Sequence, residues 1–180
     1  MAGLRAGSGG QVDPKLVEAV RVADAESLRK LEAVLAEPCW PGFDEIGRDG
    51  AHALWLLAQH ADTRPDLQRE ALRKMELRVK EGQADAGDFA YLTDRVRVAA
   101  GEPQRFGTQF TADADGVQRP FPVEAPSELE RRRAELGLPS MAEYARMLSS
   151  ALGSPARPEP LATFPPRPDQ PGARPQPQSR

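Results

Sequence analysis

The residues best suited to acid–base chemistry lie at the end of an apolar stretch that runs from residue 49 to residue 61. An imidazole has a reference pKa of about 6.5, so His60 could act as a general base near neutral pH. Gln59 and Asp62 lie close enough in the sequence to orient the imidazole or a ligand. The alternative is a buried His–Gln pair that only fixes the packing of a helix.

The other histidine, His52, lies eight residues before His60. On a straight helix this spacing separates the rings by about 12 Å along the axis and roughly 80° around it, so they cannot bind one metal ion together. The single cysteine, Cys39, excludes a site built from several thiolates, and no His or Lys lies beside it to activate it. We therefore expect an inert thiol, no metal and no cofactor.

A second helical stretch supplies partners for the imidazole. Tyr91, Asp94, Arg95 and Val98 recur at positions i, i+3, i+4 and i+7, so they share one stripe of a helix. Asp94 could accept a hydrogen bond from His60 and fix its tautomer, while Arg95 and the Tyr91 hydroxyl could bind a carboxylate or phosphate. The alternative is a surface ion pair that contributes little to stability.

The segment after this helix adds neutral polar groups. Gly107 permits a close approach of the backbone, and Thr108 and Gln109 could orient a polar ligand, although turn chemistry explains the first two residues equally well. Trp55 could line a pocket with its indole donor. The catalytic candidates are His60 and Asp94, and the ligand-binding candidates are Trp55, Gln59, Asp62, Tyr91, Arg95, Gln104, Thr108 and Gln109.

Apolar residues at helical spacing predict an all-α fold, a small helical bundle with a short extended loop or hairpin near residues 104–126. Helices are expected over residues 13–36, 49–61, 63–81 and 85–100, followed by two short helices capped by Ser127 and Ser140. The first helix could break near Asp24. The second has apolar side chains on every side, so we expect it in the middle of the bundle with its polar groups buried.

The ends of the chain differ from this helical domain, which is expected over residues 13–150. Residues 1–12 are rich in glycine and are predicted to be a disordered leader. Residues 151–180 are rich in proline and are predicted to be a disordered tail that contains no packed element. Its prolines could present a polyproline helix to an aromatic groove, or act as a solvated spacer.

Composition excludes several classes of function. The formal net charge is −3 over 180 residues, so no global positive field attracts nucleic acid or an anionic membrane surface. The longest clean apolar run, residues 53–58, is far too short to span a bilayer. The single cysteine is typical of a reducing compartment, and we expect a cytoplasmic protein. Abundant Arg, Ala, Gly and Pro are typical of a GC-rich bacterial genome.

Three motifs resemble those of an uncharacterised bacterial family, common in actinobacteria, that is catalogued as a domain of unknown function. They are W-x-x-x-Q-H-A-D at residues 55–62, Y-L-T-D-R-V at residues 91–96 and Q-x-F-G-T-Q at residues 104–109. The resemblance covers about residues 24–148 and implies a shared polar site but no particular reaction. Relatives usually have Tyr in place of Phe106, and commonly an additional N-terminal helix with an Asp–Gln pair. If that helix completes the site, its absence here implies a weakened or inactive version.

The leading hypothesis is a buried polar cluster that binds a small polar or anionic ligand. Hydrolysis or proton transfer there would use His60 as the base, Asp94 as its orienting partner and Arg95 as the charge clamp. The alternative is an interaction module that binds a protein partner and in which the cluster is structural. Binding that is lost in His60→Gln or Asp94→Asn, with Tm changed by only a few degrees, would favour the ligand site.

Overall fold

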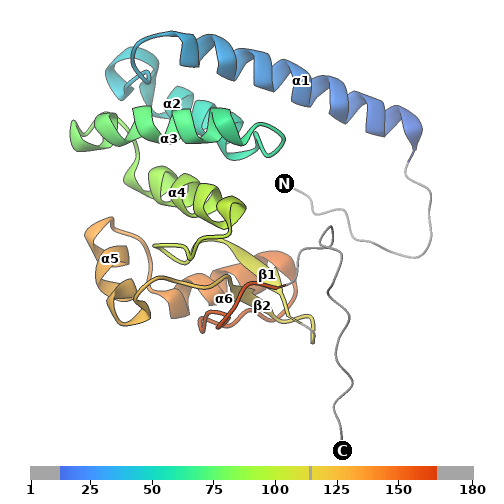
Figure 1. Ribbon diagram of the computed structural model, residues 1–180, viewed down its shortest axis with the longest axis vertical. Coiled ribbons are helices and arrows are strands. Elements are labelled where there is room, and N and C mark those ends of the chain that lie inside the picture. The colour runs from blue at the N-terminus through green and yellow to red at the C-terminus, as the bar shows by residue number, and fades with distance from the viewer. Residues whose placement is uncertain (1–12, 114, 166–180) are drawn as a thin grey trace, which may run out of the picture.

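The computed structural model describes residues 13–113 and 115–165, which form helices and one small hairpin. In chain order the elements are α1 (Pro14–Ala36), α2 (Phe43–Gln59), α3 (Pro65–Lys80), α4 (Ala86–Ala100), β1 (Phe110–Ala112), β2 (Gln118–Pro120), the 3-10 helix η1 (Pro126–Glu128), α5 (Leu129–Glu135) and α6 (Met141–Leu152). Figure 1 shows α1, α2 and α3 together at the top, α4 in the middle, and the hairpin with α5 and α6 below. The predicted fold class is confirmed, including the hairpin.

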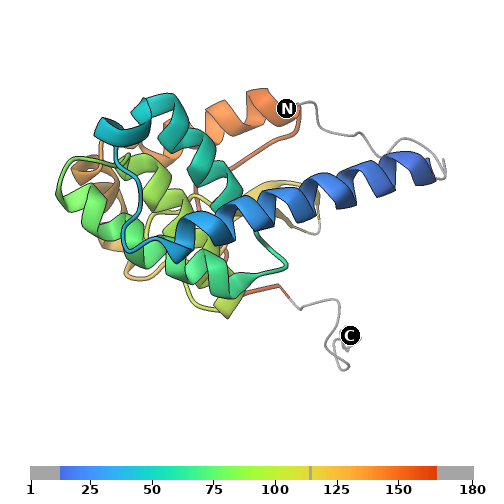
Figure 2. The ribbon, with the colours of Figure 1, turned by 90° about the horizontal axis from the view of Figure 1, so that it is seen from above.

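Helix α1 is a single helix that continues through Asp24 without a break. It begins where the sequence indicates, because the Asp13 carboxylate accepts a hydrogen bond from the Lys15 N–H and Pro14 occupies the first turn. Lys74 of α3 satisfies carbonyl groups at its other end, donating from Nζ to the oxygens of Leu35 and Glu37. Figure 2 shows the N-terminal half of α1 projecting beyond the other helices.

Helix α2 begins six residues earlier than the expected start at residue 49. Gly47 has φ 68° and ψ 173°, so the helix is kinked there and one more turn precedes the kink. Helix α3 begins after Arg64, and Thr63 does not cap it. Ser140 caps α6 through the expected capping box with Glu143.

The main core lies among α1, α2, α3 and α4. Its buried side chains include Leu31, Trp40, Leu54, Trp55, Ala58, Ala71, Met75 and Leu92. Helix α2 contributes one face to this core, while His52, Ala53 and His60 are exposed. The expected central position of α2 is therefore wrong: positions 52, 56 and 60 form an i, i+4, i+8 stripe that no neighbouring helix fully covers.

A second, smaller core lies under the hairpin, where Val123, Leu129 and Met141 pack together with Phe110. Strands β1 and β2 pair antiparallel, with Phe110 opposite Pro120. None of the helices in the described residues has the length and apolar character needed to cross a lipid bilayer.

The part of the proline-rich segment that the structure describes packs against β2 and Phe121. The Gln118 N–H donates to the Pro155 carbonyl over 2.8 Å, and the Leu161 N–H donates to the Pro120 carbonyl over 2.9 Å. The rings of Phe121 and Phe164 are 5.8 Å apart. The expectation that no packed element follows residue 151 is therefore wrong up to residue 165, and residues 1–12 and 166–180 lie outside the described residues.

Two truncations test whether residues 154–165 of the tail add stability. A chain that ends at Gly153 loses the contacts of residues 155–164 with β2 and Phe121, so we expect its Tm to fall by several degrees. A chain that ends at Pro165 keeps those contacts and should have the same Tm as the full-length protein. Calorimetry on both truncations checks this, and equal Tm values would show that residues 154–165 add no stability.

Candidate functional site

The Asp94 carboxylate lies at the centre of the polar residues that the sequence singles out. Asp94 is fully buried on α4 and accepts hydrogen bonds from the backbone N–H groups of Arg105, Phe106 and Thr108, and from the Thr108 hydroxyl. Burial raises the pKa of this carboxyl, and the N–H donors oppose that shift. A buried carboxylate with this many donors fixes the course of the loop over residues 105–108.

Helix α5 holds the same loop from its other side. Arg133 donates from Nη1 to the Phe106 carbonyl, and Arg132 donates from Nε to the Arg105 carbonyl over 2.8 Å. Burial lowers the pKa of Arg133, whose guanidinium also lies 5.2 Å from the centre of the Tyr144 ring. The N–H groups and the carbonyl groups of the loop are thus bound by opposite charges.

Gln104 closes the ends of this loop. Its amide Nε2 donates to the carbonyls of Gln109 and Phe121 over 3.0 and 2.9 Å, and its Oε1 accepts from the Gln109 N–H over 2.9 Å. Gln104 is fully buried and all these partners are backbone groups. It therefore positions Gln109 rather than presenting its own amide to a ligand.

Arg95 connects this loop to the end of α2. It makes a two-pronged ion pair with Asp62 through Nε and Nη2, and its Nη1 donates to Gln109 Oε1 over 3.3 Å. Gln109 in turn donates to the Thr108 hydroxyl over 3.1 Å. One continuous chain of hydrogen bonds therefore joins Asp62, Arg95, Gln109, Thr108 and Asp94.

Gln68 of α3 is a member of this network that sequence reasoning missed. Its Nε2 donates to the Asp62 carboxylate over 3.2 Å and to the Gln59 carbonyl over 3.3 Å. Gln68 is fully buried, beside Ala71 on the packed face of α3. A glutamine within an apolar stripe was the available signal, because a buried amide must find partners.

Trp55 and Gln59 lie side by side on α2 with unpaired polar atoms. Trp55 is 8% exposed and Gln59 is 7% exposed, and within the described residues neither Trp55 Nε1 nor Gln59 Oε1 has a hydrogen-bond partner. The two residues are one helical turn apart on the same face. The Tyr91 ring of α4 lies edge-on to the Trp55 ring at 6.1 Å. One face of α2 thus carries an unpaired donor and an unpaired acceptor one turn apart, with an aromatic ring of α4 against the Trp55 ring. This set of three residues is called the Trp55–Gln59 pair with Tyr91 below.

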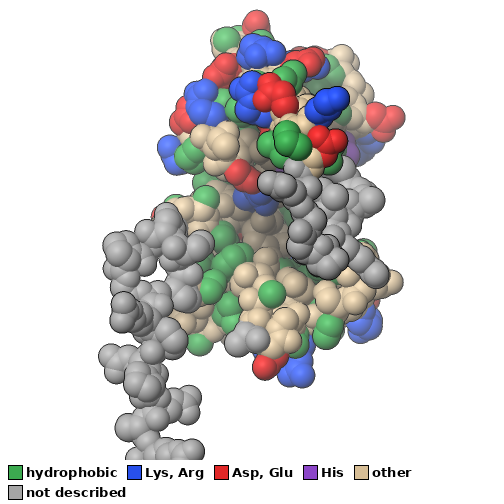
Figure 3. Space-filling view, turned by 90° about the vertical axis from the view of Figure 1, so that its right-hand side faces the viewer, with side chains coloured by type: hydrophobic (Ala, Val, Ile, Leu, Met, Phe, Trp, Pro, Cys, Tyr) green, Lys and Arg blue, Asp and Glu red, His purple; other side chains and the backbone are tan. Residues whose placement is uncertain are grey.

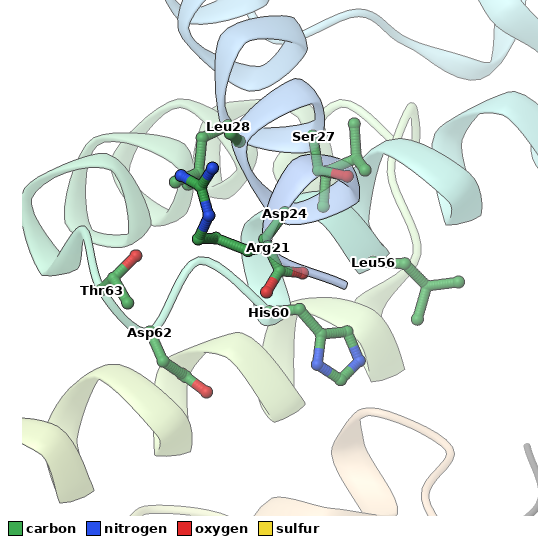
Figure 4. Close-up of a pocket in the computed structure, with 10 residues that line it drawn as sticks. Arg21, Asp24, Ser27, Leu28, Leu56, His60, Asp62 and Thr63 are labelled. Atoms are coloured by element: carbon green, nitrogen blue, oxygen red, sulfur yellow. The ribbon is translucent and has the colours of Figure 1, made fainter. Parts of the chain in front are cut away.

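His60 does not face Asp94, and the expected His60–Asp94 contact is wrong. His60 is the exposed C-cap residue of α2, and all the hydrogen bonds of Asp94 come from residues 105–108. His60 instead lines a hollow of about 620 Å³ under α1, together with Asp24 and Asp62. In Figure 4 the His60 ring and the Asp62 side chain lie apart from each other.

An imidazole–carboxylate pair does exist, but His52 and Asp88 form it. His52 Nδ1 lies 2.9 Å from Asp88 Oδ2, and the His52 ring also packs against the Trp55 ring at a centroid distance of 4.9 Å. Asp88 is in the first turn of α4, where its N–H donates to the Asp85 side chain. The available signal was that Asp85 and Asp88 open the helix that packs against α2.

The Asp62–Arg95 pair should be visible in a titration. The hydrogen bonds from Arg95 hold the pKa of Asp62 below its usual range. The pair therefore stabilises the fold above the pKa of an ordinary aspartate, and this contribution is lost as the pH falls through the lower folded-state pKa. We expect carboxyl NMR to report a low midpoint for Asp62 that rises in Arg95→Gln. An unchanged midpoint would show that the ion pair does not form in solution.

The described residues contain no group of three or more His, Cys, Asp or Glu side chains arranged to hold a metal ion. The surface of the upper helices carries Lys and Arg mixed with Asp and Glu, and Figure 3 shows no large area of one sign on the face in view. The same view shows the surface hollowed between these helices and the lower part of the molecule.

Comparison with known proteins matches most of the chain to one family. A family model described as "Family of unknown function (DUF6624)" matches residues 7–157, which include α2, α4 and the loop over residues 104–109. No curated protein and no solved structure matches the chain. Because the family model covers far more than half of the 180 residues, the chain belongs to this family of unknown function, DUF6624.

Proposed function

We propose that this protein binds a small, neutral polar molecule between α2 and α4, at the Trp55–Gln59 pair with Tyr91. The observation that carries the proposal is that an unpaired indole N–H and an unpaired amide oxygen occur one helical turn apart on α2, both in residues more than nine-tenths buried. Each unpaired buried polar group costs about 1 to 3 kcal/mol. A ligand that accepts from one and donates to the other removes both costs.

The chemistry of the ligand follows from these atoms. It must offer an acceptor to Trp55 Nε1 and a donor to Gln59 Oε1, which is the pattern of a cyclic amide or of one edge of a heterocyclic base. The Tyr91 and Trp55 rings supply apolar contact for a flat molecule. Such pockets typically combine aromatic walls with a few fixed polar groups.

The charges nearby favour a neutral ligand. The Asp62 carboxylate already binds Nε and Nη2 of Arg95, so the guanidinium that the sequence offers as a clamp for anions is neutralised. The polar side of the proposed site is then formed by Arg95, Gln109 and Thr108, which hydrogen-bond to one another. Asp94 holds Thr108 in place, and Gln104 holds Gln109. His60 and Asp62 line the hollow under α1.

The two tryptophans of the chain allow a direct binding test. In Trp40→Phe the only indole is Trp55, so its fluorescence reports on the proposed site. We expect titration with 2-pyrrolidone, uracil or nicotinamide to change this emission in a saturable way for at least one probe. The matched control is Trp55→Phe, in which the fluorescence of Trp40 should not respond. Flat titrations with all three probes in a folded Trp40→Phe chain would contradict the proposal.

A pair of glutamine variants separates binding from a purely structural role. Gln59→Leu removes an unpaired oxygen, so it should abolish the response of Trp55 without lowering the free energy of unfolding. Gln68→Leu removes two formed hydrogen bonds and should be destabilising. If the cluster only supports a protein-interaction module, Gln59→Leu should be destabilising instead and no probe should bind.

A further inference from the structure

We propose a second, separate site in the hollow between α2 and the start of α4, where His52 acts as a nucleophile toward small neutral esters. This hollow has a volume of about 430 Å³ and is lined by Phe43, Arg48, Asp49, His52, Ala53, Leu56, Asp85 and Asp88. Its size falls within the range of roughly 300 to 1,000 Å³ that is usual for small-molecule sites. The site does not depend on the ligand proposed above.

The His52 ring is held in place from two sides. Asp88 Oδ2 lies 2.9 Å from Nδ1, and the Trp55 ring packs on the imidazole. The His52 side chain is 56% exposed, whereas that of Asp88 is only 13% exposed. Within the described residues Nδ1 is the ring nitrogen that is hydrogen-bonded, so a proton on Nδ1 leaves the lone pair of Nε2 free to react, and His52 itself lines the hollow.

Asp88 is itself fixed, which makes it a positioning residue. It belongs to the first turn of α4, and its N–H donates to the Asp85 carboxylate over 3.0 Å. Burial raises the pKa of Asp88, and the hydrogen bond with His52 opposes this shift. A largely buried carboxylate beside an exposed imidazole is the arrangement that holds one tautomer of the ring.

The lining of the hollow defines the substrate class. Three aspartates, Asp49, Asp85 and Asp88, line the hollow together with one guanidinium, that of Arg48, so the site repels anions. Phe43, Ala53 and Leu56 provide an apolar wall for an uncharged acyl group or leaving group. Arg48 lies over the Phe43 ring at 4.3 Å, where its charge can stabilise an oxyanion as it forms.

The reaction needs only an ester and water. Nε2 of His52 attacks the carbonyl carbon, the bond from this carbon to the leaving oxygen breaks, and the alcohol leaves as its anion. The acylimidazolium loses its Nδ1 proton to solvent. Water then attacks the acyl carbon, the bond to Nε2 breaks, and the carboxylic acid and the free imidazole are released.

The test uses p-nitrophenyl acetate with the full chain, because His52 and His60 are its only histidines. His60 is exposed at the end of the same helix and makes no hydrogen bond with a carboxylate of the described residues, so it serves as an internal control. We expect His52→Gln to lower the second-order rate of p-nitrophenolate release at least tenfold, and His60→Gln to lower it less than twofold. Equal losses in the two variants would show two ordinary surface imidazoles and overturn the proposal.

Asp88→Asn tests the positioning role, with a readout that a general loss of stability does not produce. We expect the rate to fall about tenfold, and ¹⁵N NMR to show His52 changing from the tautomer protonated on Nδ1 to a mixture of both. Unchanged rate and tautomer in a folded variant would remove Asp88 from the mechanism. Loss of p-nitrophenyl acetate reactivity with intact binding at Trp55, or the reverse, separates this site from the one proposed above.

Discussion

Replacing Asp94 with asparagine is expected to lower the free energy of unfolding by about 3 kcal/mol, which corresponds to a fall of roughly 10 °C in Tm. Both carboxylate oxygens of Asp94 accept hydrogen bonds, from three backbone N–H groups and one hydroxyl. An asparagine keeps one of these oxygens and turns an NH₂ group toward the remaining donors. The loop over residues 105–108 then has buried donors without acceptors.

This effect is far larger than the few degrees expected from the sequence for a residue that only orients an imidazole. Thermal and denaturant unfolding of Asp94→Asn measure it, and Asp66→Asn is the control. Asp66 pairs with Arg64 on the surface, where such pairs contribute about 0 to 1 kcal/mol. If both variants lost the same small amount of stability, Asp94 would not be organising the loop.

Gly107→Ala is the second change with a large expected effect. Gly107 has φ +68°, and a Cβ atom built there would lie 2.8 Å from Sδ of the buried Met141. Left-handed backbone costs an alanine about 1 to 2 kcal/mol, and overpacking a core adds about 1 to 3 kcal/mol. We expect a loss of about 3 kcal/mol, because the buried Met141 side chain must shift to admit the methyl group.

Gly116→Ala is the matched control for this substitution. Gly116 has φ +77°, but nothing lies within 4 Å of the position of its Cβ. This variant should therefore lose only the backbone strain, about 1 to 2 kcal/mol. Denaturant unfolding of both chains isolates the packing contribution, and equal losses would show that Met141 does not constrain the loop.

Local signals in the sequence were sufficient to predict most of the helices. Asp13 with Pro14, Asp85, and Ser140 with Glu143 cap the helices that they were expected to cap, because a cap depends on residues within one turn. The early start of α2 was not predictable in this way. It depends on a single glycine, Gly47, that adopts a positive φ, which the residue type permits but does not require.

Sequence reasoning brought the correct polar residues together but assigned two of them the wrong partners. The stripe shared by Asp94 and Arg95 is real, yet the two side chains are about 100° apart around the helix. Arg95 meets Asp62, and Asp94 turns to the loop that follows its own helix. Backbone N–H groups without strand or helix partners at residues 105–108 were the signal for this second contact.

The exposure of His60 could not be inferred from the residue types around it. Apolar residues on every side of α2 suggested full enclosure, but alanines bury little area, and Leu56 and Leu57 are only partly buried at the edge of the core. Which face of α2 stays uncovered depends on where α1 and α4 cross it. That crossing is a tertiary property. It brings His52, and not His60, within hydrogen-bond distance of a carboxylate on α4.

The most direct test of the central claim is the indole N–H resonance of Trp55 in a ¹H–¹⁵N spectrum, assigned by its absence in Trp55→Phe. The structure predicts an indole without a hydrogen bond in the free protein, whose proton shifts downfield when 2-pyrrolidone, uracil or nicotinamide binds. An indole proton that is already hydrogen-bonded in the free protein, and that no saturating probe displaces, would contradict it.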